Sequence, residues 1–453
     1  MRIPAEAAQY IRKGVPLLGQ PNYPSPLLHS SKLSLFLPDS ATEDCQVLLS
    51  PFYPQTCQGS DSDPRPLAFE QAGPRKSIYF NPAEARAAIV TCGGLCPGLN
   101  DVIRSLVLTL TFHYGVNEIH GIRYGFSGMV DSSEHPPVRL TPELIEPISN
   151  EGGSYLGTSR GNQDSAEMVE FLRKRSINIL FCIGGDGTQK GALAISHAAE
   201  KIHYPLSVIG LPKTIDNDIG LVERTFGFET AVAVAGEVLR GAHVEATAEY
   251  NGVVIVKLMG RQSGFLAAYA SIASGDVNFL LIPEVKFDLD GPGGFIEALK
   301  SRLSQRHHAL VVVAEGVAET LLPHQKDCCG VDASGNKIYD DIGIYLKDQV
   351  ARRFKQDGFK AKVRYIDPSY LVRSLRANAS DSVYCQMLGQ NAVHAAMSGR
   401  TRMIVATCHR IPCHIPTEAA VLERKFVDPQ GPLWRTAVET TGQRVMRNEG
   451  IDD

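Results

Sequence analysis

The length, composition and charge of this chain argue against several classes of protein. With 453 residues, 43% of them hydrophobic and 21% charged, the sequence is typical of a globular protein of two to three domains. A formal net charge of −4 gives no support for a nucleic-acid or anionic-membrane partner. No apolar stretch approaches the roughly 20 residues of a membrane helix, and no apolar signal block stands at the N-terminus. We therefore expect a soluble, cytoplasmic protein.

The first 84 residues differ from the rest of the chain in composition. They contain twelve of the 27 prolines, and only short apolar pieces lie between them. Because proline fixes φ and removes a hydrogen-bond donor, we expect an N-terminal proline-rich arm that is extended and packed on the body, or only partly ordered. Packing of this arm on a neighbouring subunit remains an open alternative.

From Ala87 onward the sequence repeats a strand, a glycine turn and a helix. The predicted strands are continuous apolar runs, as expected for parallel strands covered on both faces. They are Ala87–Thr91, Ile177–Ile183, Leu206–Leu211, Val253–Leu258, Phe279–Pro283, Leu310–Ala314 and Met403–Thr407. An apolar stripe predicts a helix over Asp101–Leu110. This alternation indicates a doubly wound α/β architecture, which binds ligands at the carboxyl ends of its strands.

The run Gly184-Gly185-Asp186-Gly187-Thr188 directly follows the predicted strand Ile177–Ile183. Glycines at such a turn let backbone amides approach a phosphate closely, and the carboxylate of Asp186 is suited to hold Mg²⁺ against the same phosphates. The pattern favours phosphoryl transfer over hydride transfer. Several kinase families share it, so the run alone does not choose between them.

Two other turns have the composition of phosphate sites. Thr91-Cys92-Gly93-Gly94-Leu95-Cys96-Pro97-Gly98-Leu99-Asn100 joins a strand to a helix, where backbone amides bind anions, although a tight turn needs glycine equally. In Gly157-Thr158-Ser159-Arg160-Gly161 an arginine between small residues suits bidentate phosphate binding. As an isolated signal the arginine is weak, because surface arginines are common.

The run Pro212-Lys213-Thr214-Ile215-Asp216-Asn217-Asp218 follows the strand Leu206–Leu211. Two aspartates at i and i+2 in extended chain point the same way and repel each other unless a cation or a proton transfer uses them. One carboxylate suits a general base and the other a metal ligand. A turn with solvated carboxylates is the alternative.

Three weaker motifs stand later in the chain. Met259-Gly260-Arg261 and Glu315-Gly316 each follow a predicted strand, and Asp367-Pro368-Ser369-Tyr370-Leu371-Val372-Arg373 reads as a turn. The arginine suits charge neutralisation on a transferring phosphoryl group, and the glutamate suits the hydroxyls of a sugar. Singly, each is better explained as a capped strand or a surface turn.

The chain has ten cysteines, which we expect to be free thiols because a long chain without a secretion signal has little use for a disulfide framework. The densest group is Cys408-His409-Arg410-Ile411-Pro412-Cys413-His414. A zinc site is one interpretation, but no second ligand pair stands at a finger-like distance. We favour a strand end that runs into a loop.

Taken in order, these motifs over roughly residues 85–415 strongly resemble those of the 6-phosphofructokinase family. The nearest likeness is to the long ATP-dependent enzymes of plants and trypanosomatids. The resemblance implies two doubly wound, Rossmann-like α/β domains with the active site in the cleft between them. We assign residues 85–228 to a nucleotide-binding domain completed by about 374–425, residues 229–373 to a sugar-phosphate-binding domain, and 426–453 to a C-terminal extension.

The resemblance also implies a role for each matching residue. Asp216 would be the base that takes the proton from the 1-hydroxyl of fructose 6-phosphate in this glycolytic reaction. Near the transferring group the catalytic set would include Thr214, Arg261 and Lys213. The residues around ATP would be Gly94, Arg160, Gly185, Gly187, Thr188 and Gly191, and Mg²⁺ would be held by Asp186 and Asp218. The sugar phosphate would be bound by Thr214, Asp216, Asp218, Met259, Gly260, Arg261, Glu315, Arg364, Tyr370 and Arg373.

The phosphoryl donor depends on Gly187, where the pyrophosphate-using branch of the family has an aspartate. An aspartate would crowd and repel the α-phosphate of a nucleotide, whereas glycine leaves room for it. Lys213 suits either donor, because a cation helps both. We therefore expect ATP as donor, with a pyrophosphate-dependent enzyme as the alternative.

Two further alternatives are distinguishable in the sequence. NAD and lipid kinases share the Gly-Gly-Asp-Gly-Thr turn, but not the run from Pro212 to Asp218 that follows it. An inactive paralogue that binds sugar phosphate for regulation is expected to have lost Asp186, Asp216 or Arg261, and all three are present. Family analogy implies an allosteric homotetramer or homodimer.

Overall fold

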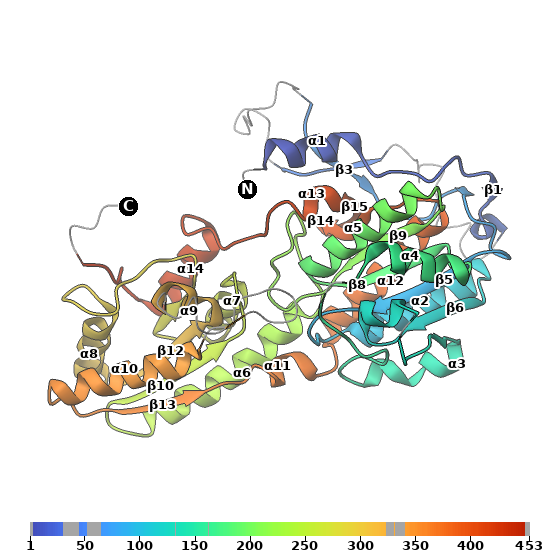
Figure 1. Ribbon diagram of the computed structural model, residues 1–453. Helices are drawn as coiled ribbons and strands as arrows, with labels where there is room; N and C mark the ends of the chain where they lie inside the picture. The colour runs from blue at the N-terminus through green and yellow to red at the C-terminus, as the bar shows by residue number, and fades with distance from the viewer. Residues whose placement is uncertain are drawn as a thin grey trace. The chain divides into compact units, whose positions relative to one another are not determined.

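The computed structural model describes residues 3–29, 45–51, 65–131, 133–161, 163–322, 330 and 340–448 (Figure 1). The chain divides into two compact units, and each is made of separate stretches of sequence. Unit 1 contains Met1–Thr214, Ile219–Gly227 and Ser374–Arg424, and unit 2 contains Ile215–Asp218, Phe228–Arg373 and Lys425–Asp453. None of the described helices is long and apolar enough to span a membrane.

Unit 1 is built on a nine-stranded sheet in the order β2-β3-β15-β14-β9-β8-β5-β6-β7. Its strands are β2 (Gln46–Leu48), β3 (Ala68–Gln71), β5 (Arg86–Thr91), β6 (Glu118–Ile122), β7 (Val138–Arg139), β8 (Ile179–Gly184), β9 (Ser207–Pro212), β14 (Met403–Cys408) and β15 (Ile411–Pro416). The five from β14 to β6 pair in parallel, and the outer ones are antiparallel. The four strands predicted in this unit are confirmed, because their buried, continuous apolar runs fit parallel pairing.

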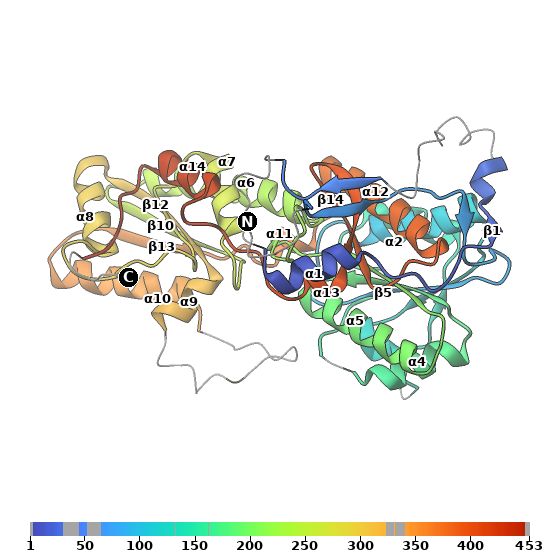
Figure 2. The same cartoon turned by 90° about the horizontal axis from the view of Figure 1, so that it is seen from above.

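Helices cover both faces of this sheet, as the doubly wound prediction requires. Figure 2 shows α2 (Leu99–Thr109) and α12 (Ala379–Met397) on one side and α4 (Ser165–Lys174) and α5 (Asp186–Lys201) on the other. The helix predicted over Asp101–Leu110 is confirmed as α2, which continues into a π-helical turn. Smaller elements are α1 (Ala5–Lys13), β1 (Tyr23–Pro24), β4 (Ser77–Ile78), α3 (Pro142–Ile145), α13 (Thr417–Ala420) and the 3-10 turns Pro26–His29, Gly125–Met129 and Pro147–Asn150.

The cysteine-rich run at 408–414 forms a β-hairpin rather than a strand followed by a loop. Cys408 ends β14, and His409 and Arg410 turn the chain with φ of 52° and 65° into the antiparallel strand β15. The strand β15 was not predicted because Pro412, His414 and Pro416 interrupt its apolar residues, so it lacks the continuous apolar run of the parallel strands. The seven described cysteines have free thiols, while Cys57, Cys328 and Cys329 lie outside the described residues.

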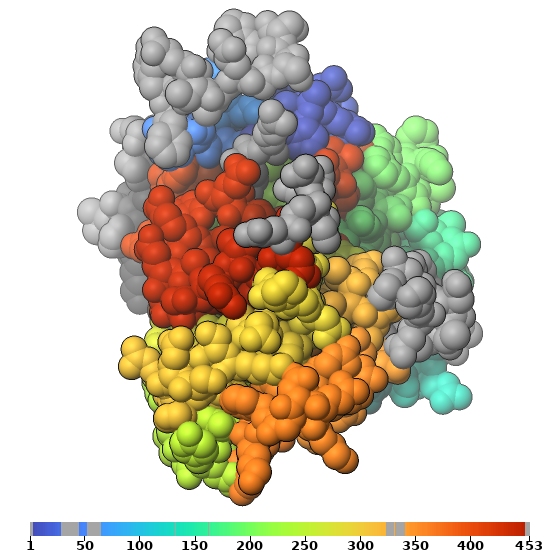
Figure 3. All heavy atoms as spheres, turned by 90° about the vertical axis from the view of Figure 1, so that its left-hand side faces the viewer, coloured from blue at the N-terminus to red at the C-terminus, as the bar shows by residue number. Residues whose placement is uncertain are grey.

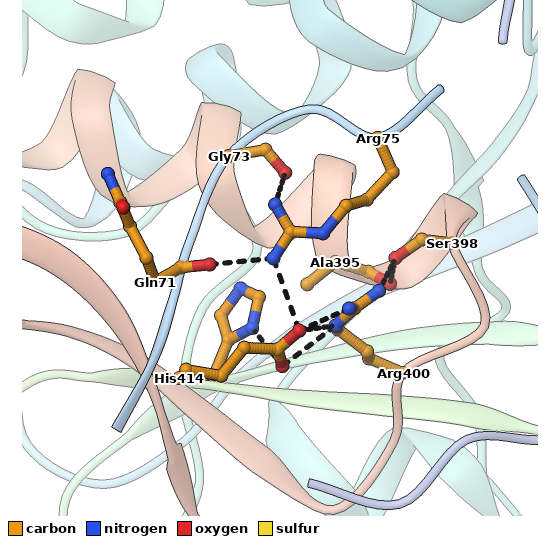
Figure 4. Close-up of polar contacts among 8 residues, drawn as sticks. Gln71, Gly73, Arg75, Ala395, Ser398, Arg400 and His414 are labelled. Carbon is orange, nitrogen blue, oxygen red and sulfur yellow. Dashed lines mark hydrogen bonds and ion pairs between the residues drawn. The ribbon is translucent and has the colours of Figure 1, made fainter. Parts of the chain in front are cut away.

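A polar cluster joins the N-terminal segment to the end of the unit 1 sheet (Figure 4). The carboxylate of Glu70 on β3 accepts hydrogen bonds at 2.9 Å from Nε of Arg400, and Nη2 of Arg75 lies 3.2 Å from its Oε1. Nδ1 of His414 on β15 lies 3.0 Å from Oε2. Burial opposes ionisation of Glu70, but the hydrogen bonds from His414 and Arg400 outweigh it and hold the pKa of Glu70 well below its usual range.

Unit 2 contains a four-stranded parallel sheet in the order β11-β12-β10-β13. Its strands are β10 (Gly252–Leu258), β11 (Phe279–Leu281), β12 (His308–Ala314) and β13 (Lys362–Ile366). Its helices are α6 (Phe228–Thr247), α7 (Phe265–Ser274), α8 (Phe295–Arg306), α9 (Ala318–Leu321), α10 (Ile342–Gln356), α11 (Leu371–Ser374) and α14 (Pro432–Thr441), with a 3-10 turn at Glu315–Val317. The three predicted strands are confirmed. The strand β13 was not predicted, because it is only half-buried and has no continuous apolar run.

The C-terminal segment is tied to the chain around α8 in unit 2. Figure 3 shows the red C-terminal residues against the yellow residues of this region. The amide of Asn448 donates to the carboxylate of Asp288 at 2.8 Å, and its side-chain oxygen accepts from the backbone of Gly293 at 3.0 Å. These two contacts join residues that are 160 and 155 positions apart in the sequence.

The Glu70 cluster gives a direct stability prediction. Glu70→Gln leaves Arg75 and Arg400 buried without their carboxylate, and breaking a buried ion pair costs about 3–5 kcal/mol. Because the folded-state pKa of Glu70 is lowered, its stabilising contribution is present above the unfolded pKa of about 4.3 and is lost as pH falls below that value. Urea unfolding from pH 7 to 3 measures both effects.

The matched control is Glu170→Gln, which removes an exposed carboxylate paired with Arg173 on α4. Exposed pairs contribute little, so this variant should unfold like the wild type at every pH. Equal stability of Glu70→Gln and Glu170→Gln would show that the buried cluster does not hold the N-terminal segment in place.

Candidate phosphoryl-transfer site

The register of three parallel strands brings the phosphate-type motifs of unit 1 to one edge of the sheet. Thr91 at the end of β5 pairs with Ile183 of β8, and Gly184 of β8 pairs with Pro212 of β9. The three turns that follow therefore begin side by side. Gln189, fully buried on α5, ties two of these strands because its amide donates to the carbonyls of Gly184 and Leu211 at 2.9 and 3.1 Å.

Hydrogen bonds connect these turns directly. The backbone amide of Gly93 donates to the carbonyl of Ser159 at 2.9 Å, which places the neighbouring Arg160 beside the first glycine turn. Nζ of Lys213, a buried lysine, donates to the carbonyl of Gly94 at 2.5 Å. The sequence-predicted residues Gly94, Arg160 and Lys213 are thus brought together, and an arginine, a lysine and glycine amides are donors that suit a phosphate.

The Gly184–Thr188 turn becomes the first turn of α5. Gly185 is the N-cap and Asp186 is the first helical residue, and the start of a helix is a position that suits an anion. A Cβ on Gly184 would lie 2.1 Å from Oγ1 of Thr188, which explains the glycine by packing. The predicted glycine turn therefore opens a helix, and the side chain of Thr188 is buried within it.

Asp186 is held by two cations that the sequence analysis did not predict. Its Oδ2 lies 3.0 Å from Nζ of Lys190 and 3.1 Å from Nη2 of Arg424. Lys190 stands four residues along α5, a spacing that signals such a pair. Arg424 lies 238 residues away, and no local pattern could have identified it. Both contacts are made to the same carboxylate oxygen.

The donor set fits a magnesium ion that is carried by phosphates rather than caged by protein. In the described part of the chain, no group of three or more histidine, cysteine, aspartate or glutamate side chains gathers to hold a metal. Mg²⁺ is commonly bound through one or two carboxylates together with substrate phosphates and water. The buried carboxylate of Asp186 beside the amides of α5 meets that requirement.

The thiols near this edge are structural. Burial raises the pKa of Cys92 to about 12, although Lys213 and a backbone hydrogen bond oppose the shift. A thiol with this pKa stays protonated at neutral pH and neither attacks a substrate nor binds a metal. Sγ of Cys96 lies 3.2 Å from the carbonyl of Phe226 in a buried contact. The spacing of these two cysteines therefore carries no chemistry of its own.

In unit 2, the carboxyl ends of three parallel strands again bring the predicted motifs together. Leu258 of β10 pairs with Ala314 of β12, so Met259-Gly260-Arg261 begins beside Glu315-Gly316. The amide of Gly316 donates to the carbonyl of Gly260 at 3.0 Å, and a Cβ on Gly316 would lie 2.3 Å from the carbonyl oxygen of Arg261. This close approach requires a glycine at 316.

The two aspartates of the run after β9 are anchored by their backbones. The carbonyl of Asp216 accepts a hydrogen bond from Oγ of Ser263 at 3.1 Å, and the carbonyl of Asp218 accepts one from the amide of Lys425 at 2.9 Å. Both aspartates are counted with unit 2, whereas Lys213 and Thr214 end a stretch of unit 1. The chain itself keeps Lys213 and Asp216 within three residues of each other.

Tyr370 lies in the turn after β13 and Arg373 in the short helix α11 that follows, and their side chains are in contact. The guanidinium of Arg373 lies 4.8 Å from the ring centroid of Tyr370, in cation–π contact, and the tyrosine is 73% exposed. Arg364 is separate from this set. It lies within β13 and pairs with Glu249 at 2.8 Å and Glu245 at 3.1 Å.

Comparison with known proteins identifies the family of this chain. The phosphofructokinase family profile matches residues 86–396, more than half of the chain. An ATP-dependent 6-phosphofructokinase of Borreliella burgdorferi is 47% identical over 389 residues, which cover 84% of this chain and 87% of that protein. ATP-dependent 6-phosphofructokinase 5 of Arabidopsis thaliana, a chloroplastic protein, is 44% identical over 375 residues, covering 82% of this chain and 68% of that one.

A solved structure has the same fold. The pyrophosphate-dependent phosphofructokinase of Marinobacter aquaeolei superposes with a TM-score of 0.64 at 20% identity, over 82% of this chain and 94% of that chain. At this identity the likeness concerns the fold alone. The profile match and the identities to the two relatives show that this chain belongs to the phosphofructokinase family.

Two glycines of α5 have different surroundings, which gives a matched prediction. A Cβ on Gly187 meets no atom within 4 Å, whereas a Cβ on Gly191 would lie 2.6 Å from Cε2 of Phe126. Both alanine variants gain the same helix propensity, so their difference isolates the clash. We expect Gly191→Ala to be less stable than Gly187→Ala by about 1–3 kcal/mol in urea unfolding. Equal stabilities would mean that Phe126 moves freely and that packing does not select Gly191.

Proposed function

We propose that this chain is an ATP-dependent 6-phosphofructokinase. It transfers the γ-phosphoryl group of ATP to the 1-hydroxyl of fructose 6-phosphate and yields fructose 1,6-bisphosphate and ADP. The observation that carries the proposal is the edge of unit 1 where the turns after β5, β8 and β9 begin side by side, with Lys213 bonded to Gly94 and Asp186 at the start of α5. The names of the relatives from Borreliella and Arabidopsis support the same activity.

The open position at Gly187 supports ATP as donor. Gly187 is exposed on the first turn of α5, and no protein atom lies within 4 Å of the position where its Cβ would be. Packing therefore does not require glycine there, unlike at Gly184 and Gly191. A nucleotide's α-phosphate would use this space, and a carboxylate in its place would repel it.

Most of the residues that we assign to the acceptor belong to unit 2, while Thr214 ends a stretch of unit 1. We assign Asp216 as the general base for the 1-hydroxyl, with Thr214 and Arg261 beside the transferring group. Met259, Gly260, Glu315, Tyr370 and Arg373 would bind the sugar phosphate, and Arg364 would act on the same ligand class. Mg²⁺, held by Asp186 and Asp218, would neutralise charge on the phosphates. Lys213 adds a cation at the start of the run that leads to Asp216.

Pyrophosphate as donor is the second candidate, because Lys213 suits both donors. The fold likeness to a pyrophosphate-dependent enzyme does not decide the donor, since the 20% identity concerns the fold alone. A homo-oligomeric state and a cytoplasmic location stay predictions.

The donor assignment is tested by Gly187→Asp. Because the position is open, the fold should accept the side chain, while its charge should repel the nucleotide. We expect kcat/KM for ATP to fall by about 10²-fold or more, which corresponds to roughly 2.7 kcal/mol. Coupled assays with fructose 6-phosphate and either ATP or pyrophosphate measure this change.

Gly187→Ala is the control, because it adds a Cβ without charge. The alanine variant should keep most of its ATP activity. Normal ATP kinetics in Gly187→Asp would contradict the donor argument, and no turnover of wild-type protein with either donor would contradict the kinase assignment as a whole.

The base assignment is tested by Asp216→Ser. Removing a general base lowers turnover by about 10²–10⁴-fold, while the binding of both substrates should change little. Initial rates give kcat, and isothermal titration gives the affinities for each substrate. Unchanged turnover would remove Asp216 from this role.

A further inference from the structure

A largely buried lysine at the end of β10 joins three segments of unit 2. The side chain of Lys257 is 13% exposed, and its Nζ is paired with the carboxylates of Asp341 and Asp367. The distance to Oδ2 of Asp367 is 2.8 Å. Asp341 precedes α10 and Asp367 follows β13, so the lysine connects a strand end, a helix start and a turn (Figure 1).

The Asp341 side of this cluster has a structural purpose. Its Oδ1 caps α10 by accepting hydrogen bonds from the amides of Gly343 and Ile344 at 2.8 and 3.1 Å. The hydroxyl of Tyr365 donates to the same carboxylate at 2.8 Å. These partners account for Asp341 without any reference to a ligand.

Asp367 contacts the segment that carries two of the proposed sugar-phosphate residues, Tyr370 and Arg373. Oδ1 of Asp367 accepts hydrogen bonds from the amide of Ser369, at 2.9 Å, and from its hydroxyl. Ser369 is buried and directly precedes Tyr370, whose own side chain is 73% exposed. The position of this ring depends on the backbone of the turn that carries it. Arg373 stacks on the same ring.

We propose that the Lys257–Asp367 ion pair is a positioning device that sets the Tyr370–Arg373 turn for binding of the acceptor's phosphate. This proposal rests on the proposed function of the chain. Lys257 stands two residues before Met259, so one side chain links both groups of residues that were assigned to the sugar phosphate. Neither Lys257 nor Asp367 needs to touch the ligand.

The charge states agree with this role. Burial raises the pKa of Asp367, but hydrogen bonds from Lys257 and Ser369 outweigh it and leave the pKa below its usual value. Asp341 behaves in the same way toward Lys257 and Tyr365. Both carboxylates are therefore ionised at neutral pH and both ion pairs are present.

The test is Asp367→Asn, which keeps the size of the side chain and removes its charge. We expect KM for fructose 6-phosphate to rise about tenfold, as for the loss of a charge-assisted hydrogen bond, while KM for ATP changes less than about twofold. Tyr365→Phe is the matched control. It removes a hydrogen bond from the other side of the cluster, so it should lower the melting temperature and leave both KM values unchanged.

The outcomes separate this proposal from the proposed function. Wild-type protein without phosphofructokinase activity overturns the function and the proposal with it. An active wild type with an unchanged KM for fructose 6-phosphate in Asp367→Asn overturns the proposal alone. Equal KM changes in Asp367→Asn and Tyr365→Phe also overturn it, because a general loss of structure then explains both.

Ser369→Ala keeps the proposal testable if Asp367→Asn does not fold. It removes one hydrogen bond between Asp367 and the turn and leaves the ion pair with Lys257 in place. A raised KM for fructose 6-phosphate, with kcat and the KM for ATP unchanged, supports the proposal. An unchanged KM for fructose 6-phosphate overturns it.

Discussion

The register between parallel strands is the constraint on which the rest of this molecule depends. In unit 1, the pairing of Gly184 with Pro212 aligns the ends of β8 and β9, and the pairing of Thr91 with Ile183 adds β5. Three loops that are distant in sequence therefore start at one edge, where backbone amides and Lys213 converge. A shift of one residue would turn each strand's side chains to the opposite face and separate the loops. In unit 2, the parallel register of β10, β12 and β13 aligns the ends of these strands in the same way.

Glycine serves two purposes along these edges, and the structure distinguishes them. Gly184, Gly191 and Gly316 are explained by protein atoms that a Cβ would meet at 2.1, 2.6 and 2.3 Å. Gly252 belongs to the same group, because its Cβ would lie 2.2 Å from the carbonyl oxygen of Ala246. This buried strand position has no room for a side chain. Gly187 alone in this comparison faces open space, which is why it carries the donor argument.

Much of the fold and of the site could be predicted from sequence, because parallel strands are continuous apolar runs that end at glycines. The same rule failed for β13, whose residues are mostly half-buried, and for β15, whose apolar residues are interrupted by two prolines and a histidine. It also failed for partners joined only by the tertiary fold. Arg424 reaches Asp186 across 238 residues, and Arg400 reaches Glu70 across 330. Charged residues of this kind have no local signature, so only the folded chain reveals their pairing.

The central claim is that the edge around Asp186 and Gly187 serves transfer of the terminal phosphoryl group of ATP to a sugar phosphate. Phosphorus NMR of the purified protein with Mg²⁺, ATP and fructose 6-phosphate follows every phosphate at once. The account predicts that the γ-phosphate signal disappears in step with the growth of ADP and of one new phosphomonoester on carbon 1 of the sugar. Release of inorganic phosphate without the monoester, or formation of the monoester from pyrophosphate but not from ATP, would contradict it.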